Sequence, residues 1–315
     1  MTDATPLWVP SQTILHDSPM ARFIAWCGER YGRSFADYDA FHAWSVAERG
    51  DFWTAVWEFC GVRGKRGERA LVNGDVMLEA RFFPDAELNF AENLLSKSGD
   101  GDALIFRGED KASDRWSWDR LTGMVSRLQQ AYRAMGIGKG DRIAAMMPNM
   151  PETVAAMLAA ASIGAVWSSC SPDFGEQGVL DRFGQIEPKL FIACDGYWYA
   201  GKLQDVSAKI AAVSAKLGAP ALIIPYAGKA DDIAASVPGA KTLPDFIAPF
   251  AAKPVEYVAL PFSHPLYILF SSGTTGVPKC IVHSAGGTLL QHLKEHRLHC
   301  GLGESDRLFY FPTCG

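Results

Sequence analysis

A segment rich in hydroxyl groups and glycine follows an apolar stretch late in the sequence. Residues 267–270 read Tyr-Ile-Leu-Phe, and residues 271–279, here called the phosphate segment, read Ser-Ser-Gly-Thr-Thr-Gly-Val-Pro-Lys. Glycine lets successive backbone N–H groups point inward, hydroxyls donate to phosphate oxygens, and lysine adds positive charge. This pattern predicts a polyphosphate site after a strand, against the alternative of a hydroxyl-rich surface turn. The residues predicted to hold phosphate are Ser271, Ser272, Gly273, Thr274, Thr275, Gly276 and Lys279.

Two other nucleotide-binding motifs do not fit the sequence. The Walker A pattern G-x-x-x-x-G-K-[ST], counted from Gly273, meets Pro278 at its second glycine and Cys280 at its metal-binding hydroxyl. The run 136–140 (Gly-Ile-Gly-Lys-Gly) lacks the third glycine of a dinucleotide fingerprint and precedes an expected strand instead of following one. The sequence therefore favours neither a P-loop NTPase nor a dinucleotide-binding enzyme.

A histidine pattern close to the end of the chain offers a different chemistry. His292, Glu295 and His296 match the His-x-x-Glu-His spacing of inverted zinc proteases, and His299 falls on the same face of an expected helix. No other motif of such proteases accompanies this short pattern. We interpret it as a polar helix face and predict no metal ligands in the chain.

Short apolar runs alternate with helical stretches from about residue 100 onward. This alternation is typical of a mainly parallel sheet with crossover helices and predicts an α/β fold. The first hundred residues are rich in aromatic residues and indicate helices, because residues such as Phe52, Val56 and Phe59 recur at helical spacing. We therefore expect a helical region over 1–100 and an α/β domain over 101–315. The expected strands are 142–147, 165–169, 189–194, 221–224, 266–270 and 307–311, and one expected helix is 202–217.

Composition and charge exclude several classes of protein. The 315 residues carry 30 basic and 35 acidic side chains, a net charge of −5, so no overall basic field favours nucleic acid or a membrane surface. The seven cysteines include no C-x-x-C pair, which favours reduced thiols over a disulfide framework. Residues 1–6 have no cationic region followed by an apolar stretch, so they do not indicate a signal peptide. We expect a cytoplasmic protein with no nucleic-acid or membrane partner.

The phosphate segment resembles the signature of the adenylate-forming acyl-CoA synthetase superfamily. Three further segments narrow the resemblance to its acetoacetate:CoA ligases: 88–95 (Leu-Asn-Phe-Ala-Glu-Asn-Leu-Leu), 147–153 (Met-Pro-Asn-Met-Pro-Glu-Thr) and 167–175 (Trp-Ser-Ser-Cys-Ser-Pro-Asp-Phe-Gly). The resemblance implies the large N-terminal AMP-binding domain of an adenylate-forming enzyme, with mainly parallel sheets and a helical extension before it. It implies ATP-dependent ligation of acetoacetate to CoA through an acyl-adenylate. A short-chain synthetase of the acetyl or propionyl type and a non-catalytic folded remnant are the alternatives.

The resemblance also implies roles for particular residues. The phosphate segment would hold the β- and γ-phosphates of ATP, with Mg²⁺ bridging them and no resident prosthetic group. Arg182 stands where related synthetases use arginine near the CoA nucleotide, although an ion-paired helix arginine fits as well. Because the resemblance covers about half of a full family member, we expect a truncated domain, incomplete after Gly315. No catalytic residue is then expected within it, its missing C-terminal half is its expected partner, and the chain is expected to be inactive alone.

Overall fold

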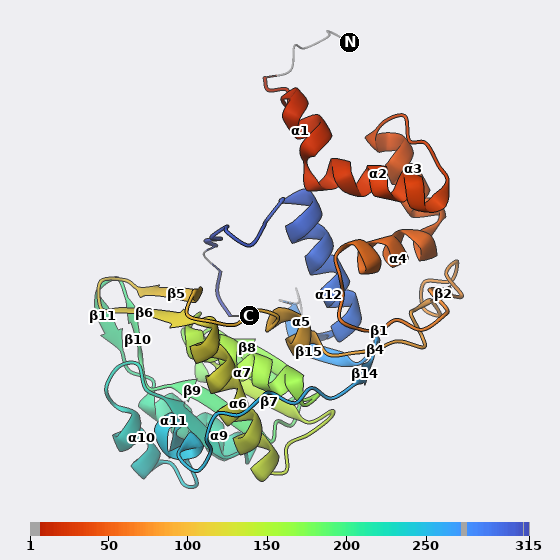
Figure 1. Cartoon of the computed structure of the whole chain (residues 1–315). Helices are drawn as coiled ribbons and strands as arrows, with labels where there is room; N and C mark the ends of the chain where they lie inside the picture. The colour runs from red at the N-terminus through yellow and green to blue at the C-terminus, as the bar shows by residue number, and fades with distance from the viewer. Residues whose placement is uncertain (1–6, 272–275, 311, 315) are drawn as a thin grey trace. The chain divides into compact units, whose positions relative to one another are not determined.

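The computed structural model describes residues 7–271, 276–310 and 312–314 of the chain. The chain divides into two compact units. One unit comprises Met1–Ala86 and Gly287–Phe309, and the other comprises Glu87–Gly286 and Tyr310–Gly315. Figure 1 shows helices α1 to α4 of the first unit and the strands of the second. A division at residue 100 stays a prediction.

Aromatic side chains form the core of the first unit. Phe23 is fully buried, and its ring centroid lies 5.8 Å from that of Phe41 and 5.1 Å from that of Phe59. Helix α2 begins after Ser18, whose hydroxyl accepts a backbone N–H, and ends at Gly32 with a φ of 62°. These contacts confirm the predicted aromatic-rich helical region. The elements are α1 (Gln12–Asp17), α2 (Pro19–Tyr31), α3 (Tyr38–Ala47), α4 (Arg49–Phe59), β1 (Gly64–Lys65), β2 (Leu71–Val72), β3 (Arg81–Phe82) and the π-helix η1 (Lys294–His299).

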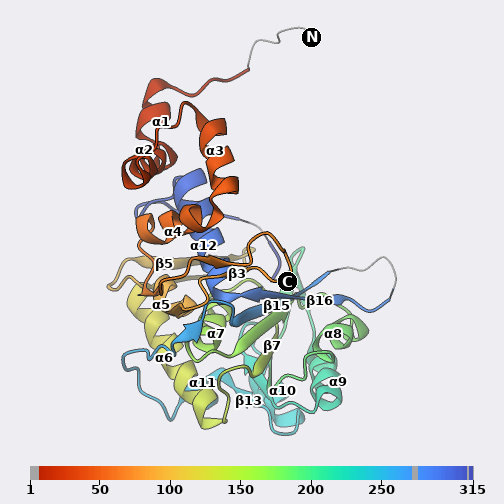
Figure 2. The ribbon, with the colours of Figure 1, turned by 90° about the vertical axis from the view of Figure 1, so that its right-hand side faces the viewer.

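A mostly parallel sheet organises the second unit. Among the described residues, its strand order is β13-β12-β9-β7-β8-β15-β16, and β16 alone runs antiparallel to its neighbour. Figure 2 shows α6, α7 and α11 on one side of this sheet and α8, α9 and α10 on the other. This doubly wound arrangement confirms the predicted α/β fold. The sheet strands are β7 (Arg142–Met146), β8 (Val166–Cys170), β9 (Leu190–Cys194), β12 (Ala221–Ile224), β13 (Lys241–Thr242), β15 (Pro265–Ser271) and β16 (Lys279–Ser284).

Smaller elements surround the sheet. Strands β5 and β6 pair antiparallel, as do β10 and β11, and β4 pairs antiparallel with β14. The helices are α5 (Phe90–Leu94), α6 (Trp118–Ala134), α7 (Pro151–Ser162), α8 (Glu176–Phe183), α9 (Ser207–Leu217), α10 (Ala230–Ser236) and α11 (Leu243–Ile247). Helix α12 (Ala285–Leu293) begins in this unit and belongs to the first unit from Gly287 onward. The remaining strands are β4 (Glu87–Leu88), β5 (Asp102–Gly108), β6 (Ala112–Ser117), β10 (Tyr197–Tyr199), β11 (Lys202–Gln204) and β14 (Leu260–Pro261).

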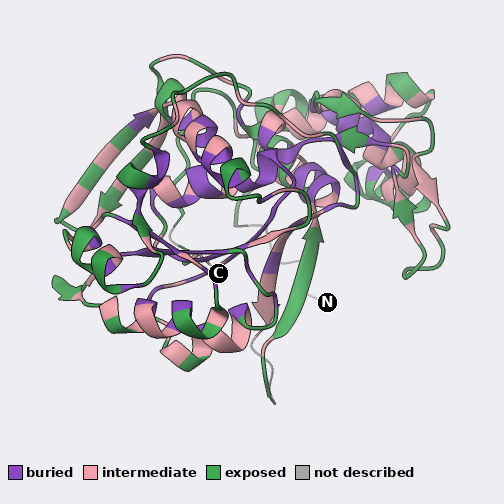
Figure 3. Ribbon diagram, turned by 90° about the horizontal axis from the view of Figure 1, so that it is seen from below, coloured by how far each residue is buried: buried purple, intermediate pink, exposed green. Residues whose placement is uncertain are grey.

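The unit β7–α7–β8 shows how local sequence builds the sheet. Pro151 occupies the first turn of α7, where its missing N–H costs nothing, and Gly164 follows the helix with a φ of 75°. The chain then enters β8, which pairs parallel with β7. The central strand β9 is covered on both faces and is apolar throughout, and every one of its residues is buried. Figure 3 shows these buried strands in purple.

Two predicted elements are wrong in part. Residues 202–204 form strand β11 and not the first turn of a helix, which begins at Ser207. The predicted strand at 307–311 is absent over 307–310, where the chain has no regular structure and Phe309 is 84% exposed; residue 311 lies outside the described residues. An apolar run predicts a strand only when a neighbouring strand and a core are present to bury it.

The seven cysteines are all free thiols. Burial raises the pKa of the thiols of Cys27, Cys170 and Cys194 to about 12, which leaves them almost entirely protonated and unreactive. Cys280 and Cys300 are exposed. None of the described helices has the length and apolar character needed to span a bilayer.

One buried amide ties several segments of the second unit together. Asn89 is 1% exposed, and its Nδ2 lies 3.2 Å from the carbonyl oxygen of Ala161, 3.1 Å from that of Ser162 and 2.9 Å from that of Val258. Its Oδ1 accepts the N–H of Ala91 and begins helix α5. A single side chain therefore joins the start of α5, the end of α7 and the segment that leads to β14.

A buried histidine gives the fold a pH dependence. His264 donates from Nε2 to the carbonyl oxygen of Gly164, 2.8 Å away, and burial lowers its pKa. The unfolded chain therefore binds a proton near pH 6.5 that the folded chain does not bind until lower pH, so stability falls as pH drops through this range. We expect the free energy of unfolding, measured by urea titration, to fall from pH 7.5 to 5.5.

The variant His264→Gln should show a flatter pH profile over the same range. The matched control His42→Gln changes an exposed histidine and should keep the slope of the wild type. If the free energy of unfolding changed with pH equally in the wild type and in His264→Gln, a group other than His264 would cause the pH dependence.

Candidate functional site

The two ends of the phosphate segment face each other across a hairpin. Strand β15 ends at Ser271 and β16 begins at Lys279, and these two residues are direct partners in the antiparallel register. Lys279 is exposed, and Gly276 has a φ of 94°, a conformation that favours glycine. The predicted site residues Ser272, Gly273, Thr274 and Thr275 lie outside the described residues. The described part therefore brings together a hydroxyl and an ammonium group at the base of one connection.

The carboxyl ends of parallel strands bring three sequence motifs to one edge of the sheet. β7 ends at Met146, β8 at Cys170 and β15 at Ser271, and the three strands run in the same direction. The motif of residues 147–153, the loop 171–175 and the phosphate segment therefore all start from this edge. Strands β7 and β9 are adjacent, and the helices that follow them, α7 and α9, lie on opposite sides of the sheet (Figure 2). Open α/β sheets bind ligands at such a point.

A partly buried lysine holds the loop 171–175 in place. The Nζ of Lys209 donates to the carbonyl oxygen of Pro172 over 2.8 Å and to that of Phe174 over 2.6 Å. Burial lowers the pKa of Lys209. The sequence analysis did not single out this lysine, because it lies on helix α9, more than 30 residues from the loop, and helix periodicity gives no signal for such a contact.

Arg182 lies on α8 with its side chain folded back along its own helix. Its Nη1 donates to the carbonyl oxygen of Gly178 over 2.7 Å, and its guanidinium carbon lies 4.4 Å from the centroid of the Phe174 ring. The cation–π contact places Arg182 beside the loop 171–175 at the carboxyl edge of the sheet. A role for Arg182 toward CoA stays a prediction.

A glutamine just after α8 contacts the C-terminal part of the phosphate segment. The Nε2 of Gln185 donates to the carbonyl oxygen of Pro278 over 2.8 Å, and its Oε1 lies 3.8 Å from the Sγ of Cys280. Sequence analysis missed Gln185, because 93 residues separate it from Pro278 and nothing local marks the pair.

The histidine pattern does not form a metal centre among the described residues, where no group of three His, Cys, Asp or Glu side chains could hold an ion. The rings of His292 and His296 stack with centroids 5.8 Å apart. Glu295 accepts from Lys294 over 2.5 Å and from Gln291 over 3.0 Å, and its Oε2 lies 3.7 Å from the Nδ1 of His299. The carboxylate is thus engaged with polar side chains close to it in sequence, and the interpretation as a polar helix face stays a prediction.

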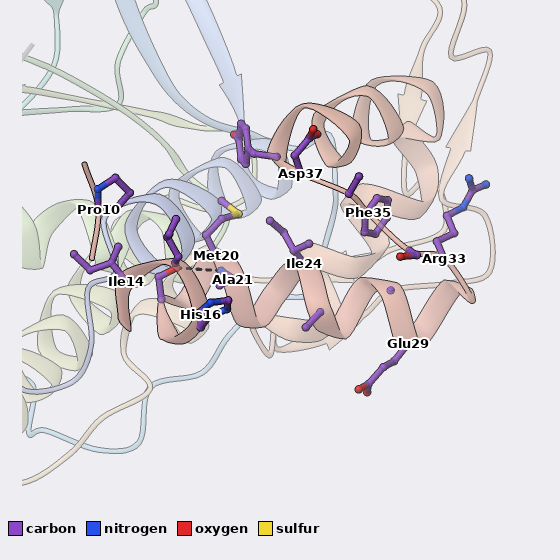
Figure 4. Close-up of a pocket in the computed structure, with 17 residues that line it drawn as sticks. Pro10, Ile14, His16, Met20, Ala21, Ile24, Glu29, Arg33, Phe35 and Asp37 are labelled. Atoms are coloured by element: carbon purple, nitrogen blue, oxygen red, sulfur yellow. Dashed lines mark hydrogen bonds between the residues drawn. The ribbon is translucent and has the colours of Figure 1, made fainter. Parts of the chain in front are cut away.

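A groove of about 950 Å³ lies in the helical unit, between α1, α2 and the start of α3. Figure 4 shows Ile14, Met20, Ile24 and Phe35 among the apolar side chains along it, with charged side chains such as Glu29 at its rim. None of the residues predicted to bind a substrate lines this groove.

Comparison with known proteins identifies the family. The AMP-binding enzyme family matches residues 91–314. The chain belongs to this family. An acetoacetyl-coenzyme A synthetase of Rhizobium meliloti (strain 1021) is 73% identical over 310 residues, which cover 98% of this chain and 48% of the relative. Acetoacetyl-CoA synthetase of Rattus norvegicus is 43% identical over 321 residues, which cover 98% of this chain and 47% of the relative.

A solved structure agrees with the fold. The acetoacetyl-CoA synthetase from Streptomyces lividans superposes with a TM-score of 0.91 at 39% identity, and the match covers 98% of this chain and 48% of that one. The chain thus spans about half the length of the curated relatives it matches. As an AMP-binding enzyme domain, it carries the α/β sheet predicted from the sequence.

Proposed function

We propose that this AMP-binding domain serves an ATP-dependent acid:CoA ligase that converts acetoacetate to acetoacetyl-CoA through an acyl-adenylate. The observation that carries the proposal is the pairing of Ser271 with Lys279 at the carboxyl edge of the parallel sheet. The relatives named above supply the substrate class, since each is an acetoacetyl-CoA synthetase by name. Because the chain spans about half of their length, the activity, the substrates and a cytoplasmic location belong to this proposal.

The chemistry requires a group that makes the carboxylate a better acyl donor. In the proposed first step, a carboxylate oxygen of acetoacetate bonds to the α-phosphorus of ATP, and the bond from that phosphorus to pyrophosphate breaks. In the second step, the CoA thiol loses its proton and its sulfur bonds to the acyl carbon, while AMP leaves with the bonding electrons. Enzymes accelerate such transfers by positioning the reactants and stabilising developing charge.

The described residues fit the leaving pyrophosphate. Lys279 supplies a compact positive charge, Ser271 a hydroxyl donor, and Gly276 a backbone position open enough for close approach, since no atom lies within 4 Å of where its Cβ would stand. In the proposal, Ser272, Gly273, Thr274 and Thr275 complete the phosphate contacts. Mg²⁺ bound to the phosphates would neutralise part of their charge, and its ligands would be mainly phosphate and water oxygens.

The second substrate would approach the same edge. We propose that Arg182, held over Phe174, contributes positive charge near the CoA nucleotide. Its hydrogen bond to Gly178 and its contact with the ring fix the guanidinium beside the loop 171–175, which begins where β8 ends.

An exposed thiol next to Lys279 provides a direct test of the phosphate site. Cys280 and Cys300 are both exposed, but Cys280 alone adjoins the phosphate segment in sequence. We expect magnesium pyrophosphate to slow alkylation of Cys280 by iodoacetamide at least threefold at saturation, because a ligand on the segment covers the thiol. Alkylation of Cys300, followed in the same samples by mass spectrometry of the peptides, should not change.

Two controls make this test specific. Magnesium sulfate at equal ionic strength separates site binding from screening of surface charge. Pyrophosphate without magnesium measures how far the metal contributes to binding. Equal alkylation rates of Cys280 with and without magnesium pyrophosphate, up to tens of millimolar, would contradict a phosphate site on this segment.

A further inference from the structure

One carboxamide contacts the chain on both sides of Lys279. Gln185 donates from Nε2 to the carbonyl oxygen of Pro278, the residue before Lys279, over 2.8 Å. Its Oε1 lies 3.8 Å from the thiol sulfur of Cys280, the residue after Lys279. The second proton of Nε2 goes to the carbonyl oxygen of Asp181 over 2.6 Å and fixes the carboxamide against helix α8.

The hydrogen bond from Gln185 holds the one backbone polar group that Pro278 offers. Pro278 has no N–H, so its carbonyl oxygen is the polar backbone group through which it can be held. The two donor protons of Gln185 are both used, one on α8 and one on the phosphate segment. The side chain of Gln185 thus links a rigid helix to the point where the segment enters β16.

The position of Gln185 argues against a role in packing. Residue 185 is exposed, and its partners Pro278 and Cys280 belong to the edge strand β16 and the connection before it. Exposed residues away from the core usually change stability little when they are replaced. A contact of this kind acts on local geometry more than on the folding of the unit.

We propose that Gln185 is a positioning residue for the polyphosphate site: it holds the backbone before Lys279 through the Pro278 carbonyl, contacts the thiol of the residue after it, and so directs the ammonium group of Lys279 toward the phosphates. The inference rests on the proposed function of the phosphate segment. Holding the backbone before the ligand arrives reduces the entropy lost on binding, so the contact raises affinity for pyrophosphate without touching it.

The test replaces the carboxamide of Gln185 and keeps the length of the side chain nearly unchanged. Gln185→Met removes both donors, and Gln185→Glu removes them and also places a carboxylate beside two carbonyl oxygens. The matched control is Gln177→Met, because Gln177 is an exposed glutamine on helix α8, which Gln185 follows, and its amide bonds to the Asp181 carboxylate and not to the phosphate segment. Thermal melting of each variant shows that the fold is retained.

The readout is the magnesium pyrophosphate concentration that gives half-maximal protection of Cys280 from iodoacetamide. We expect this concentration to rise about fivefold in Gln185→Met, as the loss of one neutral hydrogen bond predicts, and further in Gln185→Glu. Gln177→Met should match the wild type. A purely structural contact with Cys280 would change the alkylation rate without pyrophosphate but leave the half-maximal concentration unchanged.

The possible results separate the two proposals. Protection of the wild type with unchanged half-maximal concentrations in both Gln185 variants overturns the role of Gln185 and leaves the phosphate site standing. Lack of protection in the wild type overturns the phosphate site and, with it, the inference. A rise in Gln185→Glu and Gln185→Met, with Gln177→Met unchanged, supports both.

Discussion

Replacing Asn89 by alanine is expected to lower the free energy of unfolding by about 3 kcal/mol, because the two N–H groups of its amide and its Oδ1 all make buried hydrogen bonds, and each lost bond costs about 1 kcal/mol. The two protons of Asn89 Nδ2 are shared among the carbonyl oxygens of Ala161, Ser162 and Val258, and the residue is only 1% exposed. Urea denaturation followed by circular dichroism measures the change. The sheet should remain formed at neutral pH in a less stable protein.

The control for this prediction is an exposed asparagine. Asn149 is exposed at the carboxyl edge of the sheet, so Asn149→Ala should change the free energy of unfolding by less than about 0.5 kcal/mol. If Asn89→Ala unfolds at the same urea concentration as the wild type, the three carbonyl oxygens must find other donors and the argument fails.

Reversing the charge of Lys279 is expected to weaken pyrophosphate binding at least tenfold. A charge-assisted hydrogen bond to phosphate contributes about 1.5–3 kcal/mol, and Lys279→Glu replaces it by repulsion between like charges. The measurement is again the magnesium pyrophosphate concentration that half-protects Cys280 from alkylation. Because Lys279 is exposed, the melting temperature should stay close to that of the wild type.

The opposite edge of the same sheet provides a matched control. Lys241 is also exposed and also begins an edge strand, β13, but it is six strands away from β16 in the sheet order. Lys241→Glu changes the net charge equally and should leave pyrophosphate binding unchanged at moderate ionic strength. Equal weakening by both substitutions would mean that net charge, and not a site at Lys279, governs binding.

Much of the sheet could be predicted because its signals are local. The strands expected at 142–147, 165–169, 189–194, 221–224 and 266–270 agree with β7, β8, β9, β12 and β15 to within one residue at each end. Each is a short apolar run bounded by residues that break strands, and burial on both faces leaves little choice of side chain. The run at 307–311 has the same apolar character but no strand neighbour over its described residues, so the same signal fails there.

The residue types of the candidate site were also predicted from the sequence, and their role in binding stays a prediction. The hydroxyls, glycines and lysine of the phosphate segment predict a polyanion site by composition, and the structure adds that Ser271 and Lys279 are partners across one hairpin. The spacing of residues in the sequence could not predict which side chains lie next to that hairpin. Lys209, Arg182 and Gln185 take their places only through the packing of α8 and α9 on the sheet.

The amino-acid sequence by itself determined the α/β class, the central strands and the residue types of the phosphate segment, since these depend on patterns within a few residues. The tertiary structure decided which distant groups meet: Asn89 with Val258 across 169 positions, and Gln185 with Pro278 across 93. Such contacts depend on how helices and strands pack. The sequence around a polar residue does not identify its distant hydrogen-bond partner. Hydrogen bonds between distant segments are therefore a property of the folded chain.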